Sequence, residues 1–530
     1  MTTFADRATL RTLELGALAA VLASLPYKLF DLDRFFVPKE LALILAAMLA
    51  CVMLIARTRT ISLNRLDQLL SLWLAFSAAS ALFATNWWLA ERAMAITFGG
   101  AACFWCARAL VRADLGPQLA AALAFAGVIA AATALLQAYG VRTELFSLNR
   151  APGGTFGNRN FIAHLCAIIL PALLFSAMRA KGRLPSLRWG AGAAIIAAAL
   201  ILSRSRAAWL ALLAGVIVLA VGLFLAFRQR DHSLPLRRAF AMLAAITLGA
   251  GAALVIPNTL DWNSASPYRD TASSIVNYKG GSGHGRLIQY ANSGKMALHH
   301  PVLGVGPGNW AVIYPKFAVE NDPSIGSDGM TSNPWPSSDW VSYLAERGVP
   351  AFVMLVLAVL VIGVEGVRAI WTGESEEARA RGAVLVATLV IVLIVGAFDA
   401  VLLLPAPTLI AWSLLGAFVP LRARTRVTIP MPTLRRAAAC LGVLVVGCAA
   451  AARSGGQIAA MSLATEGARL TSLERASGYD PGSFRIHVRL ANAYAGRGDC
   501  KKARPHADAA RRLFPSSPAA RRAAAGCGHA

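Results

Sequence analysis

The chain alternates long apolar runs with short polar connections. Most runs approach the roughly 20 residues that an α-helix needs to cross a bilayer. Their apolar character is continuous and does not alternate from residue to residue, which favours buried helices over strands. The pattern predicts an all-α polytopic membrane protein with about thirteen transmembrane helices, within a range of 11–14. The expected spans lie at about 13–25, 41–55, 66–83, 93–107, 119–139, 161–178, 189–202, 207–227, 240–256, 350–367, 383–401, 406–419 and 437–452.

One polar stretch, at about 257–348, interrupts this pattern and is rich in Gly and Pro. Irregular backbone cannot lie in hydrocarbon with its polar groups unpaired, so this stretch must fold in water or against protein. We call it the polar loop. We interpret it as a loop on the membrane surface that builds a reaction site.

Charge predicts how the chain is oriented. The sequence is 57% hydrophobic and only 15% charged, with a formal net charge of +24, which excludes an ordinary soluble enzyme. Lys and Arg cluster in every second connection, whereas the connections 84–91 and 402–405 contain none. By the positive-inside rule, the N-terminus lies in the cytoplasm and the polar loop and C-terminal tail lie outside. Short clusters between apolar runs are topology signals, so we expect no nucleic-acid partner.

The tail has a different character from the rest of the chain. We expect a membrane domain at 1–455 and a helical tail at 456–530. Pro481 and Pro515 are 34 residues apart, the period of a tetratricopeptide repeat, and 457–522 would hold one repeat and a half. Two short units are marginally stable alone, so the tail should pack on the membrane domain or on a partner protein. The repeat-type positions are Leu473, Ala476, Leu490, Ala491, Tyr494 and Ala503.

Two properties of the tail leave alternatives open. Residues 457–530 contain twelve Lys or Arg and five Asp or Glu, a net charge of +7. That charge suits an anionic glycan or lipid surface, but a solvated basic repeat without a ligand is an equally good interpretation. Cys500 and Cys527 either form a disulfide or stay free, since a tail outside the cytoplasm permits both.

Basic residues on the outer side are the first candidates for function. Arg204 and Arg206 form a charged turn between two apolar spans, where an arginine is costly unless it is paired or bound; the alternative is snorkelling at a helix end. Arg286 follows a Gly-rich run that could bring backbone N–H groups to an anion, and its guanidinium matches phosphate. The alternative there is an ordinary surface loop. The Gly-Pro-rich turn at 304–309 fits no dinucleotide motif and more plausibly fixes the loop backbone.

Two polar residues near the ends of spans complete the candidates. Asp399 is either half of a structural ion pair or a residue of the site. Gln137 is expected only to cap backbone groups. No metal or cofactor is expected.

Several segments resemble those of the O-antigen ligase and polymerase-like membrane proteins, which are related to bacterial O-oligosaccharyltransferases. The resemblance covers about 140–420. It is carried by G-G-T-F-G-N-R-N-F at 153–161, S-R-S-R-A-A-W at 203–209, Gly285-Arg286, H-P-V-L-G-V-G-P-G-N at 300–309, and Glu346-x-Gly348. A tetratricopeptide tail also occurs in such proteins.

The resemblance implies a metal-independent glycosyltransferase in the bacterial inner membrane. Its donor would be a glycan on undecaprenyl pyrophosphate, and its acceptor a hydroxyl of lipid A core, a glycan or a protein on the periplasmic face. Arg204 or Arg206, together with Arg286, would hold the pyrophosphate, and Asn160 and Asp399 would support the site. The alternatives are a polysaccharide polymerase of the same fold, or an inactive assembly scaffold that recruits partners through its tail.

The sequence departs from the family at one position. The family carries a His nine residues before the Glu of the last loop segment, and here that position is Ser337. Serine is a poor general base at neutral pH, which leaves Asp339 or Glu346 as the expected proton acceptor. The histidines of the polar loop occupy other positions: His284, His299 and His300.

Overall fold

A computed structural model describes residues 2–146, 150–228, 236–274, 281–326, 329–420 and 427–525, and these are mainly helical. Within these ranges, ten helices are long and apolar enough to cross a membrane. This confirms the all-α polytopic fold. The ten are α2 (Asp33–Arg57), α4 (Trp87–Arg112), α5 (Gly116–Ala138), α6 (Arg159–Arg179), α7 (Arg183–Ser203), α8 (Arg206–Arg228), α9 (Leu236–Val255), α13 (Asp339–Thr372), α14 (Glu376–Phe398) and α16 (Thr433–Leu463).

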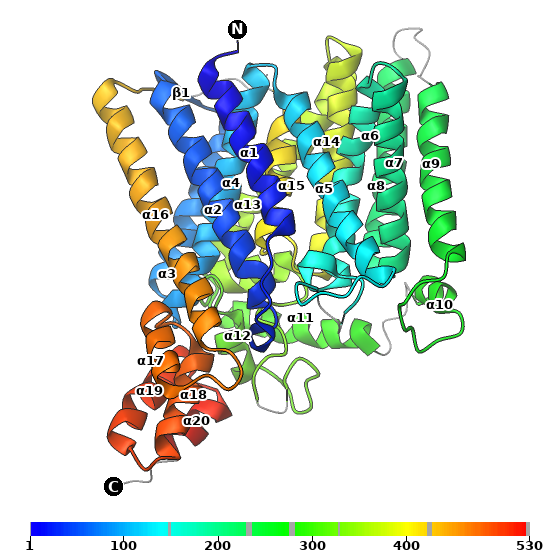
Figure 1. Cartoon of the computed structure of the whole chain (residues 1–530). Helices are drawn as coiled ribbons and strands as arrows, with labels where there is room; N and C mark the ends of the chain where they lie inside the picture. Colours follow the sequence, from blue (N-terminus) through cyan, green and yellow to red (C-terminus); the bar gives the residue numbers. More distant parts are fainter. Residues whose placement is uncertain are drawn as a thin grey trace.

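The other three expected spans are also helices of the same bundle: α1 (Phe4–Leu22), α3 (Arg65–Leu82) and the shorter α15 (Pro405–Phe418). The bundle core runs through most of these helices, while α9 and α16 flank it at opposite edges (Figure 1). The two strands, β1 (Thr60–Leu63) and β2 (Val427–Pro430), pair antiparallel and join the connection after α2 to the start of α16.

The polar loop is more helical than its composition predicts. It contains α10 (Pro267–Ser273), α11 (Gly281–His299) and α12 (Trp310–Ile313), and α11 lies across the end of the bundle (Figure 1). The Gly-rich run, expected to form an irregular anion-binding turn, instead begins α11 from Gly281 onward. Met296 and Ala297 are buried against α12 and α13, so tertiary packing offsets the low helix propensity of glycine. Lys279 and Gly280 lie outside the described residues.

The loop ends at a break inside α13. Gly348 has a φ of 78°, a left-handed value that favours glycine. A Cβ atom there would lie 2.2 Å from the carbonyl oxygen of Val302. The break therefore separates a first segment, from Asp339 to Arg347, from the membrane-crossing part of α13.

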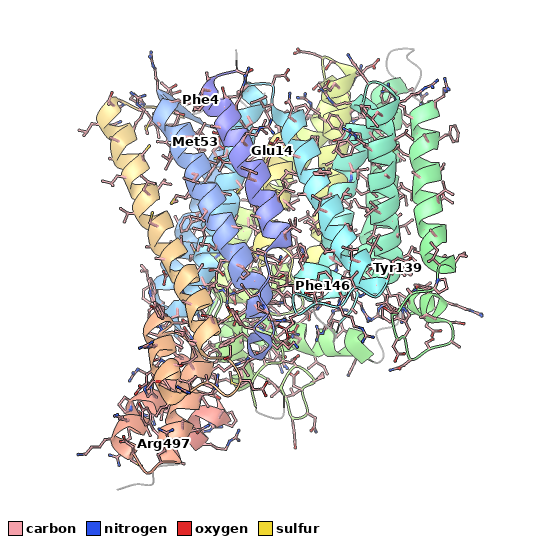
Figure 2. The ribbon with its side chains drawn as sticks, in the orientation of Figure 1. Phe4, Glu14, Met53, Tyr139, Phe146 and Arg497 are labelled. Atoms are coloured by element: carbon pink, nitrogen blue, oxygen red, sulfur yellow. The ribbon has the colours of Figure 1, made fainter. Side chains whose placement is uncertain are left out.

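The two ends of the chain lie at opposite ends of the bundle. The N-terminus lies at one end, and the polar loop and the tail lie together at the other (Figure 1). Figure 2 shows the same separation in side chains, with Phe4 and Glu14 toward one end and Tyr139 and Phe146 toward the other. The charge pattern predicts this separation of the N-terminus from the polar loop and the tail.

The tail consists of α17 (Leu470–Tyr479), α18 (Phe484–Ala495), α19 (Cys500–Leu513) and α20 (Pro518–Ala525). The expected repeat positions are all buried, although their identity as tetratricopeptide repeats stays a prediction. Ile486 and Leu490 share a core with Phe30 and Val37 of the membrane domain. Of the two predicted alternatives, packing on the membrane domain or on a partner protein, the structure shows the tail packed against the region of Phe30 and α2. Cys527 lies outside the described residues, so its pairing with Cys500 stays a prediction.

A histidine pair joins α18 to α19. The Nδ1 atoms of His487 and His506 are 3.0 Å apart, and His487 Nε2 lies 3.0 Å from the carbonyl oxygen of Pro481. Because that carbonyl can only accept, we place a proton on His487 Nε2, and His487 Nδ1 then accepts from His506 Nδ1–H. A second proton on His487 would occupy its Nδ1, the acceptor atom, and would abolish this hydrogen bond.

We therefore expect the tail to loosen on acidification. Burial lowers the pKa of both His487 and His506, with Arg512 opposing the charge of the first and Glu474 favouring that of the second. Above about pH 6.5, the unfolded value, the stability that this pair contributes is fully present, and it is lost as the pH falls toward the lower native values. The protection factors of amides 484–513 in the full chain, which correct for the slower intrinsic exchange at acid pH, should fall as the pH is lowered below about 6.5. Unchanged protection, or an unchanged pH dependence in His506→Ala, would contradict this prediction.

Candidate functional site

A cavity of about 530 Å³ lies where the start of α6, the start of α11 and the end of α14 meet. The two other walls come from the end of the connection before α6 and from residues 323–337 of the polar loop. We call it the arginine cavity. Its polar lining includes Arg150, Asn158, Arg159, Asn160, Arg286, Gln289, Ser324, Ser332, Asn333, Ser337 and Asp399.

Three arginines face this cavity, namely Arg150, Arg159 and Arg286. Within the described part of the chain, no guanidinium of the three forms an ion pair or a hydrogen bond. Asp399 is the one carboxylate among the lining residues, so the lining carries a formal charge of +2. Guanidinium groups match phosphate oxygens in bidentate geometry, and the cavity therefore suits a polyvalent phosphate.

The segment before α6 is tied down by residues distant in sequence. The side-chain oxygen of Gln137 accepts the N–H groups of Gly153 and Gly154 at 2.9 and 2.8 Å, which confirms its predicted role. Thr155 donates to the carbonyl of Val21 at 2.6 Å. Asn158 then caps α6 by accepting the N–H of Asn160 at 3.0 Å. These bonds place Arg159 and Asn160, the first residues of α6, at the cavity wall.

The charged turn between α7 and α8 lies beside the cavity rather than in it. Arg204 has a left-handed φ of 52° and donates from Nε to Thr271 Oγ1 at 2.8 Å. Arg206 donates to the carbonyl of Ser274 at 2.7 Å. Both side chains thus hold the α10 region of the polar loop.

Trp262 contacts both Arg204 and Arg159. The Arg204 guanidinium carbon lies 4.7 Å from the centre of the Trp262 ring, and that of Arg159 lies 4.8 Å from the same centre. Cation–π attraction to the ring lets the two like charges approach each other. The structure therefore brings Arg286 together with Arg150 and Arg159, whereas Arg204 contacts Trp262 and does not line the cavity.

Ser337 and Asp399 both line the cavity. The backbone of Ser337 is fixed by α11, because its N–H donates to Gln289 Oε1 at 2.6 Å and its carbonyl accepts from Tyr290 at 2.6 Å. Asp399 follows the last residue of α14, is partly exposed, and accepts the N–H of Ala400 at 2.9 Å. The position where the family carries its histidine thus shares a cavity with a carboxylate.

The two carboxylates that the sequence nominated as proton acceptors are buried elsewhere. Asp339 accepts the N–H groups of Val401 and Leu402, each at 2.9 Å. Glu346 accepts the N–H of Trp310 at 3.0 Å and the hydroxyl of Ser342 at 3.1 Å. Neither residue lines the arginine cavity. Glu346 thus pairs with a backbone donor at the start of α12, and Asp339 pairs with backbone donors in the connection from α14 to α15.

The loop histidines also lie away from the cavity. His284, His299 and His300 are exposed, and none is among its lining residues. Sequence reasoning did not single out Arg150 or Arg159. A signal was present, because 140–160 is predicted to be an outer connection and nevertheless carries Arg142, Arg150 and Arg159, against the rule that leaves such connections uncharged.

One buried histidine was missed as well. His164 lies one helical turn after Asn160 in α6, and its Nε2 is 3.4 Å from Ser205 Oγ. Its Nδ1 is buried without a hydrogen-bond partner. A single histidine in an apolar run gives no sequence signal that separates it from a core residue.

Comparison with protein families gives one match. Residues 191–356 match the family model described as O-antigen ligase. The matched segment runs from α7 to the first part of α13, so it contains Arg204, Arg206, Arg286 and Ser337, whereas Arg159 and Asp399 lie outside it. No curated protein matches the chain. Over this segment, which is less than half of the chain, the protein is similar to the O-antigen ligase family.

Proposed function

We propose that this chain transfers a glycan from undecaprenyl pyrophosphate to an acceptor hydroxyl, with the arginine cavity as its active site. One observation carries the proposal: Arg150, Arg159 and Arg286 face one cavity without an anionic partner in the described residues. Grouping unpaired like charges is unfavourable unless a ligand supplies the counter-charge. The family match independently supports a lipid-linked glycan as substrate.

The reaction needs stabilisation of a leaving group. As the bond between the sugar C1 and the pyrophosphate oxygen breaks, its electron pair stays on the pyrophosphate. The three guanidinium groups neutralise this growing charge, an effect worth orders of magnitude in rate when the donors are already in place. Arg204 has an indirect role, because it contacts Trp262, the ring that Arg159 also contacts, and does not itself line the cavity. Neither the cleavage of the bond to the pyrophosphate nor the stabilisation of the leaving group needs a metal or a cofactor.

A base must take the proton of the acceptor hydroxyl as its oxygen bonds to C1. We assign this role to Asp399, because it is the carboxylate that lines the cavity and is partly exposed there. Asp339 and Glu346 are assigned structural roles instead, since their oxygens already accept backbone and hydroxyl donors. Ser337 lies at the wall where the acceptor would approach.

We further propose that the cavity opens on the periplasmic side of the bacterial inner membrane and that the tail is a tetratricopeptide domain at 456–530. The separation of the N-terminus from the loop and tail supports the first (Figure 1), together with the distribution of Lys and Arg. A polysaccharide polymerase would use the same cavity and differ only in its acceptor.

Replacing the proposed base tests this mechanism. Asp399→Asn should lower kcat by about 100-fold or more, the usual contribution of a general base. Its Kd for undecaprenyl pyrophosphate should stay equal or fall, because a negative charge leaves an anion site. Both quantities can be measured with the purified full chain and a lipid-linked glycan. Asp261→Asn, which changes an exposed aspartate of the polar loop, is the control. Transfer by Asp399→Asn at the normal rate would remove Asp399 from the mechanism.

A further inference from the structure

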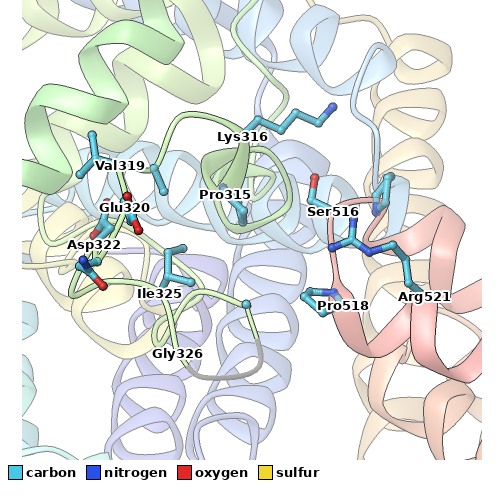
Figure 3. A pocket seen from close by; sticks show the side chains of 14 residues that line it. Pro315, Lys316, Val319, Glu320, Asp322, Ile325, Gly326, Ser516, Pro518 and Arg521 are labelled. Atoms are coloured by element: carbon cyan, nitrogen blue, oxygen red, sulfur yellow. The ribbon is translucent and has the colours of Figure 1, made fainter.

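A second cavity, of about 690 Å³, lies between the polar loop and the tail. Figure 3 shows its two sides: residues 315–326 of the loop on one, and Ser516, Pro518 and Arg521 from the α19–α20 region on the other. The two sides are in close contact at Gly329 of the loop and Pro518 of the tail. A Cβ atom placed on Gly329 would lie only 2.5 Å from the Pro518 ring, so there is no room for a side chain there. We call it the loop–tail pocket.

Its charges are unpaired and come from both sides. Lys316 of the loop and Arg521 of the tail both line it, and both are exposed. Neither side chain forms an ion pair or a hydrogen bond with the described residues. The lining also contains two carboxylates, of which Asp322 already accepts from Tyr314 and Ser324 and Glu320 is exposed. Lys316 and Arg521 are the groups available to an anionic ligand.

The remaining polar lining suits hydroxyl groups. Glu320 offers a carboxylate acceptor, Asn321 offers both a donor and an acceptor, and Ser516 offers a hydroxyl. Saccharides present many hydroxyls, and an acidic or phosphorylated saccharide adds the anion that Lys316 and Arg521 require. Val319 and Ile325 add apolar surface for the C–H groups of sugar rings.

One turn of chain separates this pocket from the arginine cavity. Asp322 lines the loop–tail pocket, whereas Pro323 and Ser324 line the arginine cavity. Asp322 accepts the hydroxyl of Tyr314 at 2.7 Å; burial raises the pKa of Tyr314, so this hydroxyl stays protonated and donates. Ser324 donates its N–H to Asp322 at 2.8 Å. The turn is therefore a fixed wall between the two cavities.

The turn of Asp322 is connected to Ser337, which lies where the acceptor would approach. Gln289 donates to Ser324 Oγ at 3.2 Å and accepts the N–H of Ser337 at 2.6 Å. Hydrogen bonds thus connect the turn of Asp322 to Ser337. A ligand in the loop–tail pocket would lie against the structure that shapes the active site.

We propose that the loop–tail pocket binds an anionic saccharide. Resting on the function proposed above, we assign this saccharide to the acceptor substrate, as a part of the acceptor remote from its reacting hydroxyl, because the turn of Asp322 separates this pocket from the arginine cavity. The lipid-linked donor approaches from the bilayer, whereas this pocket lies at the end of the molecule that carries the loop and the tail, away from the bundle (Figure 1). The tail would then contribute directly to acceptor binding.

Binding to the full chain in detergent tests the proposal. The probes are trigalacturonate, its neutral methyl ester, and a mannose trisaccharide bearing a phosphomonoester, each labelled at the reducing end. Wild type should bind one or both anionic probes, and the double variant Lys316→Ala/Arg521→Ala should weaken that binding at least about tenfold, as expected for two charge-assisted contacts. Arg522→Ala, the exposed neighbour on α20, should bind as wild type does.

Three results would overturn the proposal: no binding of either anionic probe to wild type, equal binding of the methyl ester, or equal binding by the double variant. Inorganic pyrophosphate, measured in parallel, separates this proposal from the proposed function. The double variant should bind pyrophosphate normally, whereas loss of pyrophosphate binding in Arg286→Ala reports on the arginine cavity alone. Saccharide binding without pyrophosphate binding would retain the pocket and reject the donor site.

Discussion

Arg286→Ala is expected to lower glycan transfer by at least about 100-fold, equivalent to about 2.7 kcal/mol in the barrier. Arg286 lines the arginine cavity from α11 and has no protein partner among the described residues. Removing it leaves the leaving pyrophosphate with less positive charge and costs the protein itself little stability. In cells, lipid-linked glycan should accumulate while mature surface polysaccharide falls.

Matched variants make this expectation specific. Arg269→Ala removes an exposed arginine of the same loop and should leave transfer unchanged. Arg159→Ala should resemble Arg286→Ala, and Arg204→Ala should cost less, because Arg204 contacts Trp262 and Thr271 rather than the cavity. Normal surface polysaccharide in Arg286→Ala would reject the arginine cavity as the donor site.

Asp339→Asn is expected to destabilise the membrane domain by about 2–3 kcal/mol. The buried Asp339 carboxylate accepts two backbone N–H groups, from Val401 and Leu402. An asparagine can accept only through its oxygen, so its NH₂ group would face one of these donors and leave it unpaired. A lower Tm of the purified chain would report this loss.

The same chemical change at Asp399 provides the contrast. Asp399→Asn should keep the Tm of wild type, because that carboxylate faces the cavity and accepts only the adjacent Ala400 N–H. Asp339→Asn should lose transfer only in proportion to the protein that unfolds. A variant Asp339→Asn with native Tm and no transfer would return the role of base to Asp339.

The mutual position of these two aspartates explains why they were hard to rank from the sequence. Asp339 begins α13 and reaches across to Val401 and Leu402, residues just after Asp399. It therefore fixes the connection that presents Asp399 to the cavity. Proximity of Asp339 to Ser337 in sequence suggested that it faced the acceptor, yet its side chain points to a different segment.

The arginines also show that the sequence does not reveal which side chains share a site. The sequence placed Arg204, Arg206 and Arg286 on one side of the membrane, and the structure keeps all three near the end of the bundle that carries the polar loop. The sequence does not reveal that Arg204 contacts Trp262 and does not line the cavity, or that Arg159 shares the cavity with Arg286. Contacts between α6, α11 and the loop after α9 join residues more than a hundred positions apart.

The sequence by itself determined the helical membrane fold, the positions of the spans and the opposite placement of the N-terminus and the polar loop. These follow from local properties, because the length of an apolar run and the charge of its flanks need no partner. Only the tertiary structure decided which arginines share a cavity, that Asp399 faces it while Asp339 and Glu346 support backbone, and that the tail closes a second pocket. Those outcomes depend on long-range packing, in which a side chain acts according to the segment that it meets and not according to its neighbours in sequence.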